Sequence, residues 1–237
     1  MGQKVNPTSF RTGIIFPTKS IWFADKKNYA KQVLEDNKTR RFLEKRLALA
    51  GLTKVEIKRS INTIDIYVHV SRPGVVIGRG GSSLELLKKE LNKLLLGYQN
   101  PPKNYPIKVN IHPLEVKNPD VSAALVLDRL TNQIERRYPH RRAIKQAIEK
   151  VMGAGAKGIK IVLSGRIGGA EIGRTEKYKQ GRIPTQTIRA NIDYAERPAL
   201  TRSGYVGVKV WIYTGDILKG KQVQSDVKTD NYRNTNK

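Results

Sequence analysis

The sequence contains no cysteine and only three histidines. Without cysteine the chain can have no disulfide framework, no zinc finger and no iron–sulfur cluster. His69, His112 and His140 each lack a second histidine or a paired carboxylate at the spacing of metal ligands. The sequence therefore predicts neither a metal site nor a bound cofactor.

Long apolar runs are also missing. No stretch of the 237 residues approaches the roughly 18–20 apolar residues of a membrane-spanning helix. The first residues, MGQKVNP, have no apolar core of the kind found in secretory signals. We therefore expect no membrane-spanning segment and no partner inside a membrane. The hydrophobic content of 38% still suffices for a packed core, which excludes a wholly disordered chain.

Acidic side chains are scarce. Against 20 Asp and Glu stand 45 Lys and Arg, which leaves a formal net charge of +25. Solubility needs a net charge of only about 2–8 in a small domain, and a larger excess destabilises a compact chain by self-repulsion. The excess therefore favours a polyanionic partner, with nucleic acid as the first candidate and an anionic membrane surface as the second.

Composition and the positions of proline and glycine divide the chain into four segments. An irregular basic N-terminal segment covers residues 1–24, a first domain covers 25–115 and a second covers 116–214. The seam between the domains lies near 113–119. The last segment, 215–237, is polar and has no hydrophobic period, which predicts a disordered tail. Both domains mix helical and strand patterns, so the predicted fold class is α+β.

In the first domain we expect a helix over 25–50, ended by Gly51. Apolar residues that alternate with polar ones predict two strands joined by a hairpin turn, at 55–57 and 64–70. A glycine turn follows, and then a helix that begins at Ser82 or Ser83. A loop over 97–106 and a strand over 107–111 complete the order helix, strand, strand, turn, helix, strand.

The glycine turn consists of Gly78, Arg79, Gly80 and Gly81. Its glycines allow two helices to meet at a sharp angle and leave no Cβ to block a ligand backbone, while the amides of the next helix suit a phosphate. A lone GxxG is most often an ordinary turn. Here its place among the flanking elements resembles a type II KH domain, whose GxxG loop clamps a nucleic-acid backbone. Gly80 departs from that pattern, since KH proteins often carry a basic residue there.

In the second domain we expect helices over 118–137 and 140–152, separated by Tyr138-Pro139. Three alternating strands follow, at 159–163, 188–194 and 206–212. A loop rich in glycine and arginine, 165–184, connects the first two strands. These patterns predict two helices packed on a three-stranded sheet.

The second of these helices carries Arg141, Arg142 and Lys145 on one face, opposite its apolar positions. A helix face that serves only solubility usually interleaves both signs, whereas this one is mostly positive and favours a polyanion. Arg136 and Arg137 extend the basic patch. Further residues expected to bind RNA lie in the glycine-rich loop, on the strand after it and in the N-terminal segment: Arg166, Arg174, Lys177, Lys179, Arg182, Arg189, Lys4 and Arg11.

Residues 153–158, GAGAKG, match the dinucleotide fingerprint GxGxxG literally. That fingerprint requires a strand before it and a helix after it, whereas here the predicted order is reversed. The phosphate-binding pattern GxxxxGK[ST] occurs nowhere in the chain. A nucleotide-dependent enzyme is therefore disfavoured, and we expect no catalytic residues.

Several motifs, in order over nearly the whole chain, resemble the bacterial-type family of small ribosomal subunit protein three, which contains a KH domain. They are MGQKVNP at 1–7, RPGVVIG at 72–78, GAKGIK at 155–160, SGRIGGAEI at 164–172 and GVKVWI at 207–212. The chain departs from the family in a longer segment 97–106 and in the Tyr138-Pro139 pair.

The resemblance implies a structural, non-catalytic role in the head of the small ribosomal subunit, bound to its rRNA beside proteins ten and fourteen. It also implies that the chain helps form the mRNA entry channel with proteins four and five. There Arg141, Arg142 and Lys145 match a basic trio that touches incoming mRNA. The resemblance fits a cytoplasmic ribosome and equally an organellar one. The alternative is a free-standing KH factor in RNA processing or subunit assembly.

Overall fold

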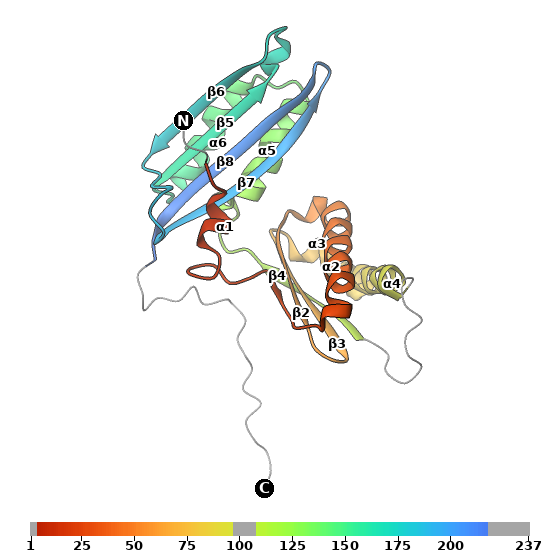
Figure 1. Cartoon of the computed structure of the whole chain (residues 1–237). Coiled ribbons are helices and arrows are strands. Elements are labelled where there is room, and N and C mark those ends of the chain that lie inside the picture. Colours follow the sequence, from red (N-terminus) through yellow and green to blue (C-terminus); the bar gives the residue numbers. More distant parts are fainter. Residues whose placement is uncertain (1–3, 97–107, 218–237) are drawn as a thin grey trace.

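The computed structural model describes residues 4–96 and 108–217, which fold into two α+β units (Figure 1). Each unit contains a four-stranded sheet, with strand orders β1-β2-β3-β4 and β6-β5-β8-β7. The predicted loop over 97–106 and nearly all of the predicted tail lie outside the described residues. The predicted boundary at 214 falls within the last strand, which ends at Asp216.

The first unit is built on the hairpin that the alternating pattern predicted. β2 (Leu52–Arg59) and β3 (Thr63–Val70) are antiparallel, and every second residue of β3 is buried. These buried positions pack against α2 (Lys26–Arg46), a 3₁₀ turn (Ala48–Ala50), α3 (Pro73–Ile77) and α4 (Ser82–Leu96). Gly51 has φ of +70° and ends the first helical stretch, as expected.

The last strand of this unit is longer than predicted. β4 (Lys108–Glu115) pairs in parallel with β3 and continues through Pro113, beyond the predicted end at residue 111. A proline is tolerated because β4 lies at the edge of its sheet, where part of its backbone needs no partner. With helix, two strands, GxxG turn, helix and strand in the predicted order, the KH prediction is confirmed.

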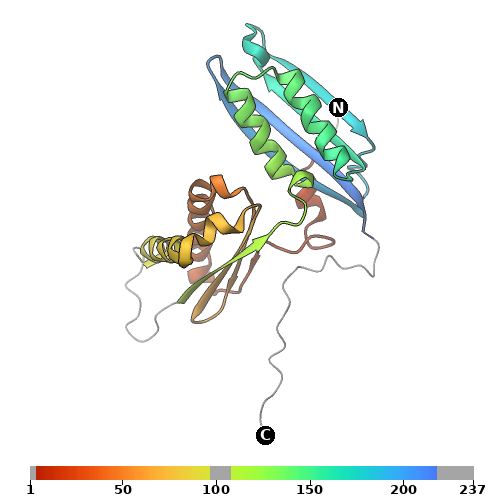
Figure 2. The ribbon, with the colours of Figure 1, turned by 180° about the vertical axis from the view of Figure 1, so that it is seen from behind.

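The second unit consists of two helices on one face of an antiparallel sheet. α5 (Ala123–Glu135) and α6 (His140–Gly153) cover the sheet on the side that faces the viewer in Figure 2. The strands are β5 (Gly158–Gly165), β6 (Arg174–Gly181), β7 (Ala190–Thr201) and β8 (Gly204–Asp216).

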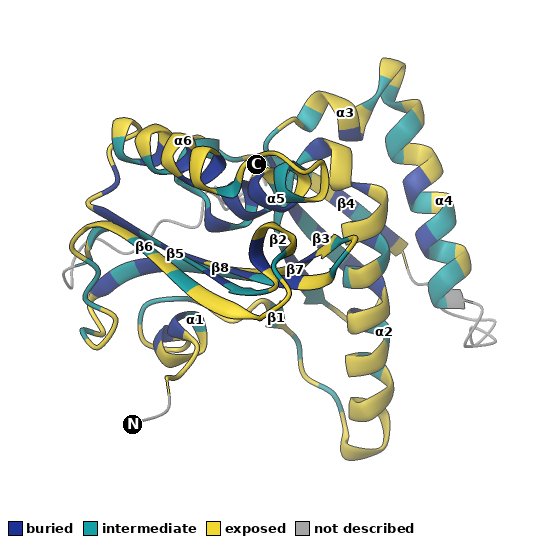
Figure 3. Ribbon diagram, turned by 90° about the horizontal axis from the view of Figure 1, so that it is seen from above, coloured by how far each residue is buried: buried dark blue, intermediate teal, exposed yellow. Residues whose placement is uncertain are grey.

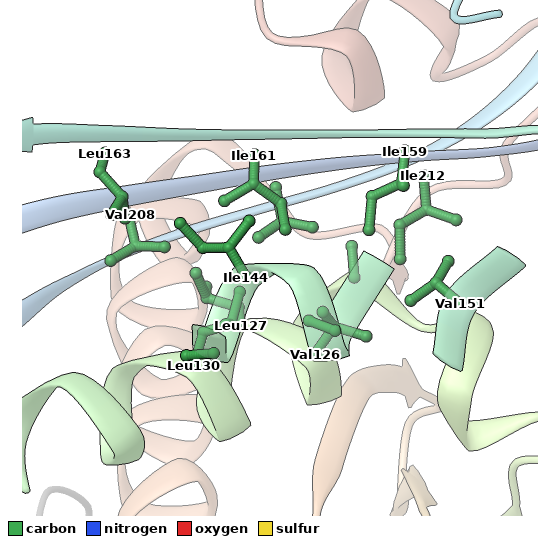
Figure 4. Packing of buried hydrophobic residues seen from close by; sticks show 14 of the residues in the cluster. Val126, Leu127, Leu130, Ile144, Val151, Ile159, Ile161, Leu163, Val208 and Ile212 are labelled. Atoms are coloured by element: carbon green, nitrogen blue, oxygen red, sulfur yellow. The ribbon is translucent and has the colours of Figure 1, made fainter. Parts of the chain in front are cut away.

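The core of the second unit lies between the helices and the sheet (Figure 4). Ile144 and Val151 of α6 point toward Ile161 of β5 and Ile212 of β8, and all four are buried almost completely. Because the apolar side chains of both layers meet here, burial of this interface is the main favourable contribution to the unit's stability.

The prediction of a three-stranded sheet is wrong, because part of the glycine-rich loop forms a fourth strand. β6 pairs with β5 over eight residues, from Gly158–Gly181 to Gly165–Arg174. The stretch RTEKYKQG shows no apolar alternation because β6 is an edge strand, and only Tyr178 packs against the core. β7 also runs further than the predicted 188–194, since it forms a long hairpin with β8.

The N-terminal segment, predicted to be irregular, contains two elements. α1 (Pro7–Arg11) begins with Asn6, whose side chain accepts from the amide of Thr8, and β1 (Ser20–Ile21) adds a parallel strand to β2. In Figure 3, α1 lies on the side of the second sheet that α5 and α6 leave open. The segment therefore joins both units.

Arg11 anchors α1, and its burial argues against the predicted contact with RNA. Its side chain is fully buried. The guanidinium donates to the carbonyls of Ala190 at 2.7 Å, Pro7 at 2.9 Å, Thr187 at 2.8 Å and Thr185 at 3.0 Å. With these donors occupied and the side chain covered, Arg11 has no surface to offer a phosphate.

Asp36 anchors the other end of the segment. This buried carboxylate of α2 accepts from the Ser20 hydroxyl at 3.0 Å, the Trp22 indole at 2.8 Å and the Arg59 guanidinium at 2.5–2.9 Å. A buried charge is stable only when paired and hydrogen-bonded, so this cluster fixes β1 against α2 and β2.

Candidate nucleic-acid interface

The GxxG turn lies at the junction of α3 and α4, and its backbone requires glycine. Gly78 has φ of +71° and ψ of −178°, a conformation essentially restricted to glycine. A Cβ on Gly78 would lie 2.6 Å from the Cβ of Ser83. Gly80 has φ of +59°, with open space around it. Arg79 between them is exposed, so the turn presents a cation and bare backbone to solvent.

The serine that follows closes the turn. The hydroxyl of Ser82 donates to the carbonyl of Arg79 at 3.0 Å. This hydrogen bond holds the turn together at the start of α4. The geometry leaves the backbone of the turn free to approach a ligand, as KH binding requires.

Gly78→Ala is expected to destabilise the KH unit by about 2–4 kcal/mol, since it adds backbone strain to a clash with Ser83. Gly80→Ala is the matched control and should cost only about 1–2 kcal/mol, because it meets the conformational penalty alone. Urea unfolding of both variants measures the difference. Equal losses would show that the tight approach to Ser83 does not constrain the turn.

The basic trio lies on the outer face of α6. Arg141, Arg142 and Lys145 are exposed, while Ala143 and Ile144 between them are buried, so the predicted division of faces is correct. Among the described residues, Arg142 and Lys145 take part in no ion pair. Their charges are therefore available to an external anion.

A hydrogen-bonded cluster fixes the start of α6 against β6. The carboxylate of Glu176 accepts from the Tyr178 hydroxyl at 2.6 Å and from Arg174 Nε at 2.7 Å, and it lies 3.1 Å from Nε2 of His140. The bonds from Tyr178 and Arg174 lower the pKa of Glu176 to about 2. Arg141 in turn interacts with Tyr178. Glu176 therefore anchors the start of the trio's helix to β6.

The Glu176 cluster makes the stability of this unit depend on pH. Because the pKa of Glu176 is held at about 2, below its ordinary value near 4.3, its ionised form stabilises the fold above about pH 4.3. This contribution is lost as the pH falls through the window from about 4.3 to 2. Glu176→Gln should therefore melt at a lower temperature than the parent chain near neutral pH, with the gap closing by pH 2–3.

Glu149→Gln, an exposed change on the same helix, is the control and should leave the melting profile unchanged. A gap between Glu176→Gln and the parent chain that stayed constant from pH 7 to pH 2 would contradict the ionic account of the cluster.

The remaining predicted residues separate into groups. Arg166 donates to the carbonyls of Ala170 at 2.8 Å and Ser203 at 3.4 Å and so closes its own loop, and Arg189 pairs with Asp216 at 3.1 Å. Arg136 and Arg137 are exposed just after α5, near the trio in sequence, and Arg182 is exposed after β6. Three lysines meet on the open face of the second sheet, around Lys160: Lys4, Lys177 and Lys179.

Lys160 is a residue that the sequence analysis missed. It alternates with Ile159 and Ile161, which are buried on the helix side of β5. This alternation already placed Lys160 on the opposite face, but no partner strand was known there. Lys160 could be recognised only once β6 was known, since the register of β6 places Lys179 directly beside Lys160.

The described part of the chain holds no group of histidine, cysteine and acidic residues that could bind a metal ion. Nor does any helix in residues 4–96 and 108–217 have the length and hydropathy to cross a membrane. Taken with the fold, the GxxG turn and the exposed trio define a KH-domain protein with a second, strongly basic α+β domain.

Comparisons with known proteins agree with that class. Residues 38–121 match the family model of the KH domain, and residues 130–212 match that of the ribosomal protein S3 C-terminal domain. Similar relatives are proteins named small ribosomal subunit protein uS3. Those of Marinobacter nauticus and Caldicellulosiruptor bescii are both 46% identical, over 96% and 95% of this chain and 96% and 98% of their own lengths. That of Desulforamulus reducens is 45% identical over 92% of this chain and 94% of its own length.

The chain belongs to the ribosomal protein S3 family, whose members are structural components of the ribosome and not enzymes. The predicted family and the predicted absence of an enzymatic role are therefore confirmed.

Proposed function

We propose that this chain is a structural constituent of the small ribosomal subunit that binds rRNA in the subunit head and contacts mRNA at the entry channel. The names of its relatives support the first part. A net charge of +25 supports RNA as the partner. The GxxG turn, the trio and the exposed cations that the sequence predicted to bind RNA are the proposed contacts.

One observation carries the mRNA contact. Arg141, Arg142 and Lys145 stand exposed on one face of a helix whose start is fixed by the Glu176 cluster. Fixed cations lose less conformational entropy on binding a phosphate than cations on a mobile loop do. The trio can therefore attract single-stranded RNA and hold its backbone while the strand moves past.

The proposed partners are those that the resemblance to the family implies. In the head the chain would neighbour small-subunit proteins ten and fourteen, and at the entry channel proteins four and five. It would act in ribosomes of the cytoplasm or of an organelle.

Co-sedimentation tests the proposal against the alternative of a free-standing assembly factor. The chain should remain in mature small subunits after a high-salt wash, because a structural constituent is held by many buried contacts. Presence only in precursor particles would contradict the proposal and favour the assembly factor.

A further inference from the structure

In the second unit, α5 and α6 cover one face of the sheet. On the opposite face, which we call the open face, α1 lies along part of the sheet (Figure 3). The register places five side chains side by side on this open face. Lys160 of β5 is directly opposite Lys179 of β6 and Trp211 of β8, and the neighbouring Val162 is opposite Lys177 and Lys209. We call these residues the sheet-face cluster: Lys160, Lys177, Lys179, Lys209 and Trp211.

Positive charge in this cluster is poorly balanced. Burial and then repulsion from Lys4, Lys177 and Lys179 lower the pKa of Lys160. Lys177 and Lys179 are exposed and form no ion pair among the described residues, whereas Lys209 is 3.4 Å from Glu196. Like charges crowded in this way raise the free energy of the unbound protein, and a bound anion relieves the cost.

The aromatic rings of the face support the lysines. The Nζ of Lys160 lies 4.9 Å from the centre of the Trp211 ring, and the Tyr194 ring is tilted against Trp211 at 5.0 Å. A cation above a tryptophan is held by the charge distribution of the ring. Because Lys160 occupies the ring, Trp211 is a poor platform for a stacked base, and the face is suited to phosphates.

β6 contributes side chains to both faces of the second sheet. Along β6, Glu176 and Tyr178 interact with α6, while Lys177 and Lys179 point to the open face. The cluster and the trio of α6 are thus separated by the full thickness of a helix layer and a sheet. An RNA strand that binds the sheet-face cluster therefore does not contact the trio through the same phosphates.

We propose that the open face of this sheet is a second RNA-binding surface, separate from α6, which takes the phosphate backbone of folded RNA. This deepens the proposed function and rests on it: the domain would hold structural RNA on its sheet while its helix face contacts mRNA. Lysine binds phosphate as a point charge and is depleted in protein–protein interfaces, so RNA fits this face better than an acidic protein segment.

Salt-dependent binding of the full chain to an RNA duplex tests the proposal. Each lost phosphate contact lowers the slope of log K against log salt by about 0.9. The variant Lys160→Gln/Lys177→Gln/Lys179→Gln should therefore reduce the slope by about 2–3. The arginine triple variant at these positions should keep it, because the charges remain.

Two controls make the result specific. Lys26→Gln/Lys27→Gln/Lys31→Gln removes the same charge from exposed positions at the start of α2 and should leave the slope nearly unchanged. The arginine triple variant is the second control, since it keeps every charge of the sheet-face cluster. Circular dichroism of each variant verifies that it is folded.

The possible outcomes are distinct. A slope unchanged in the sheet-face variant, while the parent chain binds RNA, overturns the inference and assigns the lysines to an acidic protein partner. An equal drop of the slope in the α2 control would show only a long-range effect of charge. That result would also overturn the inference. Failure of the parent chain to bind any RNA refutes the proposed function itself.

Discussion

Replacing Arg11 with Met should lower the free energy of unfolding of the second domain by about 3–5 kcal/mol. The substitution keeps much of the volume but removes every donor from a fully buried site, where the carbonyls of Ala190, Thr185 and Thr187 lose their partner. In a domain of about 100 residues this loss lowers the melting temperature by more than about 10 °C. Calorimetry of the full chain measures it.

Arg129→Met provides the control for Arg11→Met. Arg129 also pairs with acceptors of its own domain, but its ion pair with Asp120 is exposed to solvent. Its removal should cost no more than about 1 kcal/mol. If Arg11→Met were equally mild, and its affinity for RNA fell instead, the structural role of Arg11 would be refuted and the original RNA-binding prediction restored.

Replacing Arg141, Arg142 and Lys145 with Ala should impair translation through structured mRNA while subunit assembly continues. The three cations face outward on α6, so their removal leaves the core of the domain intact. For single-stranded RNA, three lost phosphate contacts should reduce the salt slope of binding by about 2. Translation of paired messages with and without a stable hairpin, by reconstituted subunits, measures the functional effect.

The control for the trio removes the same number of charges elsewhere. Subunits that carry the variant Lys26→Ala/Lys27→Ala/Lys31→Ala should translate both messages as well as subunits with the parent chain do. If the trio variant fails first in assembly, before any difference between the two messages appears, the trio binds rRNA and its assignment to mRNA is wrong.

Periodicity predicted the parts of the fold that bury apolar side chains. The alternation of Ile64, Ile66, Val68 and Val70 placed β3 correctly, because one face of that strand is fully buried. The trio was found for the same reason, since the buried positions of α6 define its outer face. In both cases local sequence and tertiary packing carry the same signal.

Periodicity could not predict the features that depend on residues far away in the sequence. β6 is stabilised by backbone pairing with β5 at an edge, which leaves no hydrophobic signature in its sequence. Arg11 looked like a surface cation, since its acceptors at 184–190 lie more than 170 residues away in the chain. The His140–Glu176 contact joins residues 36 apart. None of these partners can be read from local spacing.

The described GxxG turn explains why glycine stands at Gly78, but its ligand stays a prediction. The turn leaves open space around Gly80, where a basic side chain would reach a phosphate. With glycine there, only Arg79 supplies a full charge within the turn. We therefore expect the KH unit to contribute less to RNA affinity than the cations of the second domain.

The most direct test of the proposed role is crosslinking from the trio in an assembled ribosome. A photoreactive amino acid placed at Lys145 should crosslink to mRNA downstream of the decoding site when a message is bound, and the yield should fall when no message is present. Crosslinks only to rRNA, with equal yield with and without mRNA, would contradict the account.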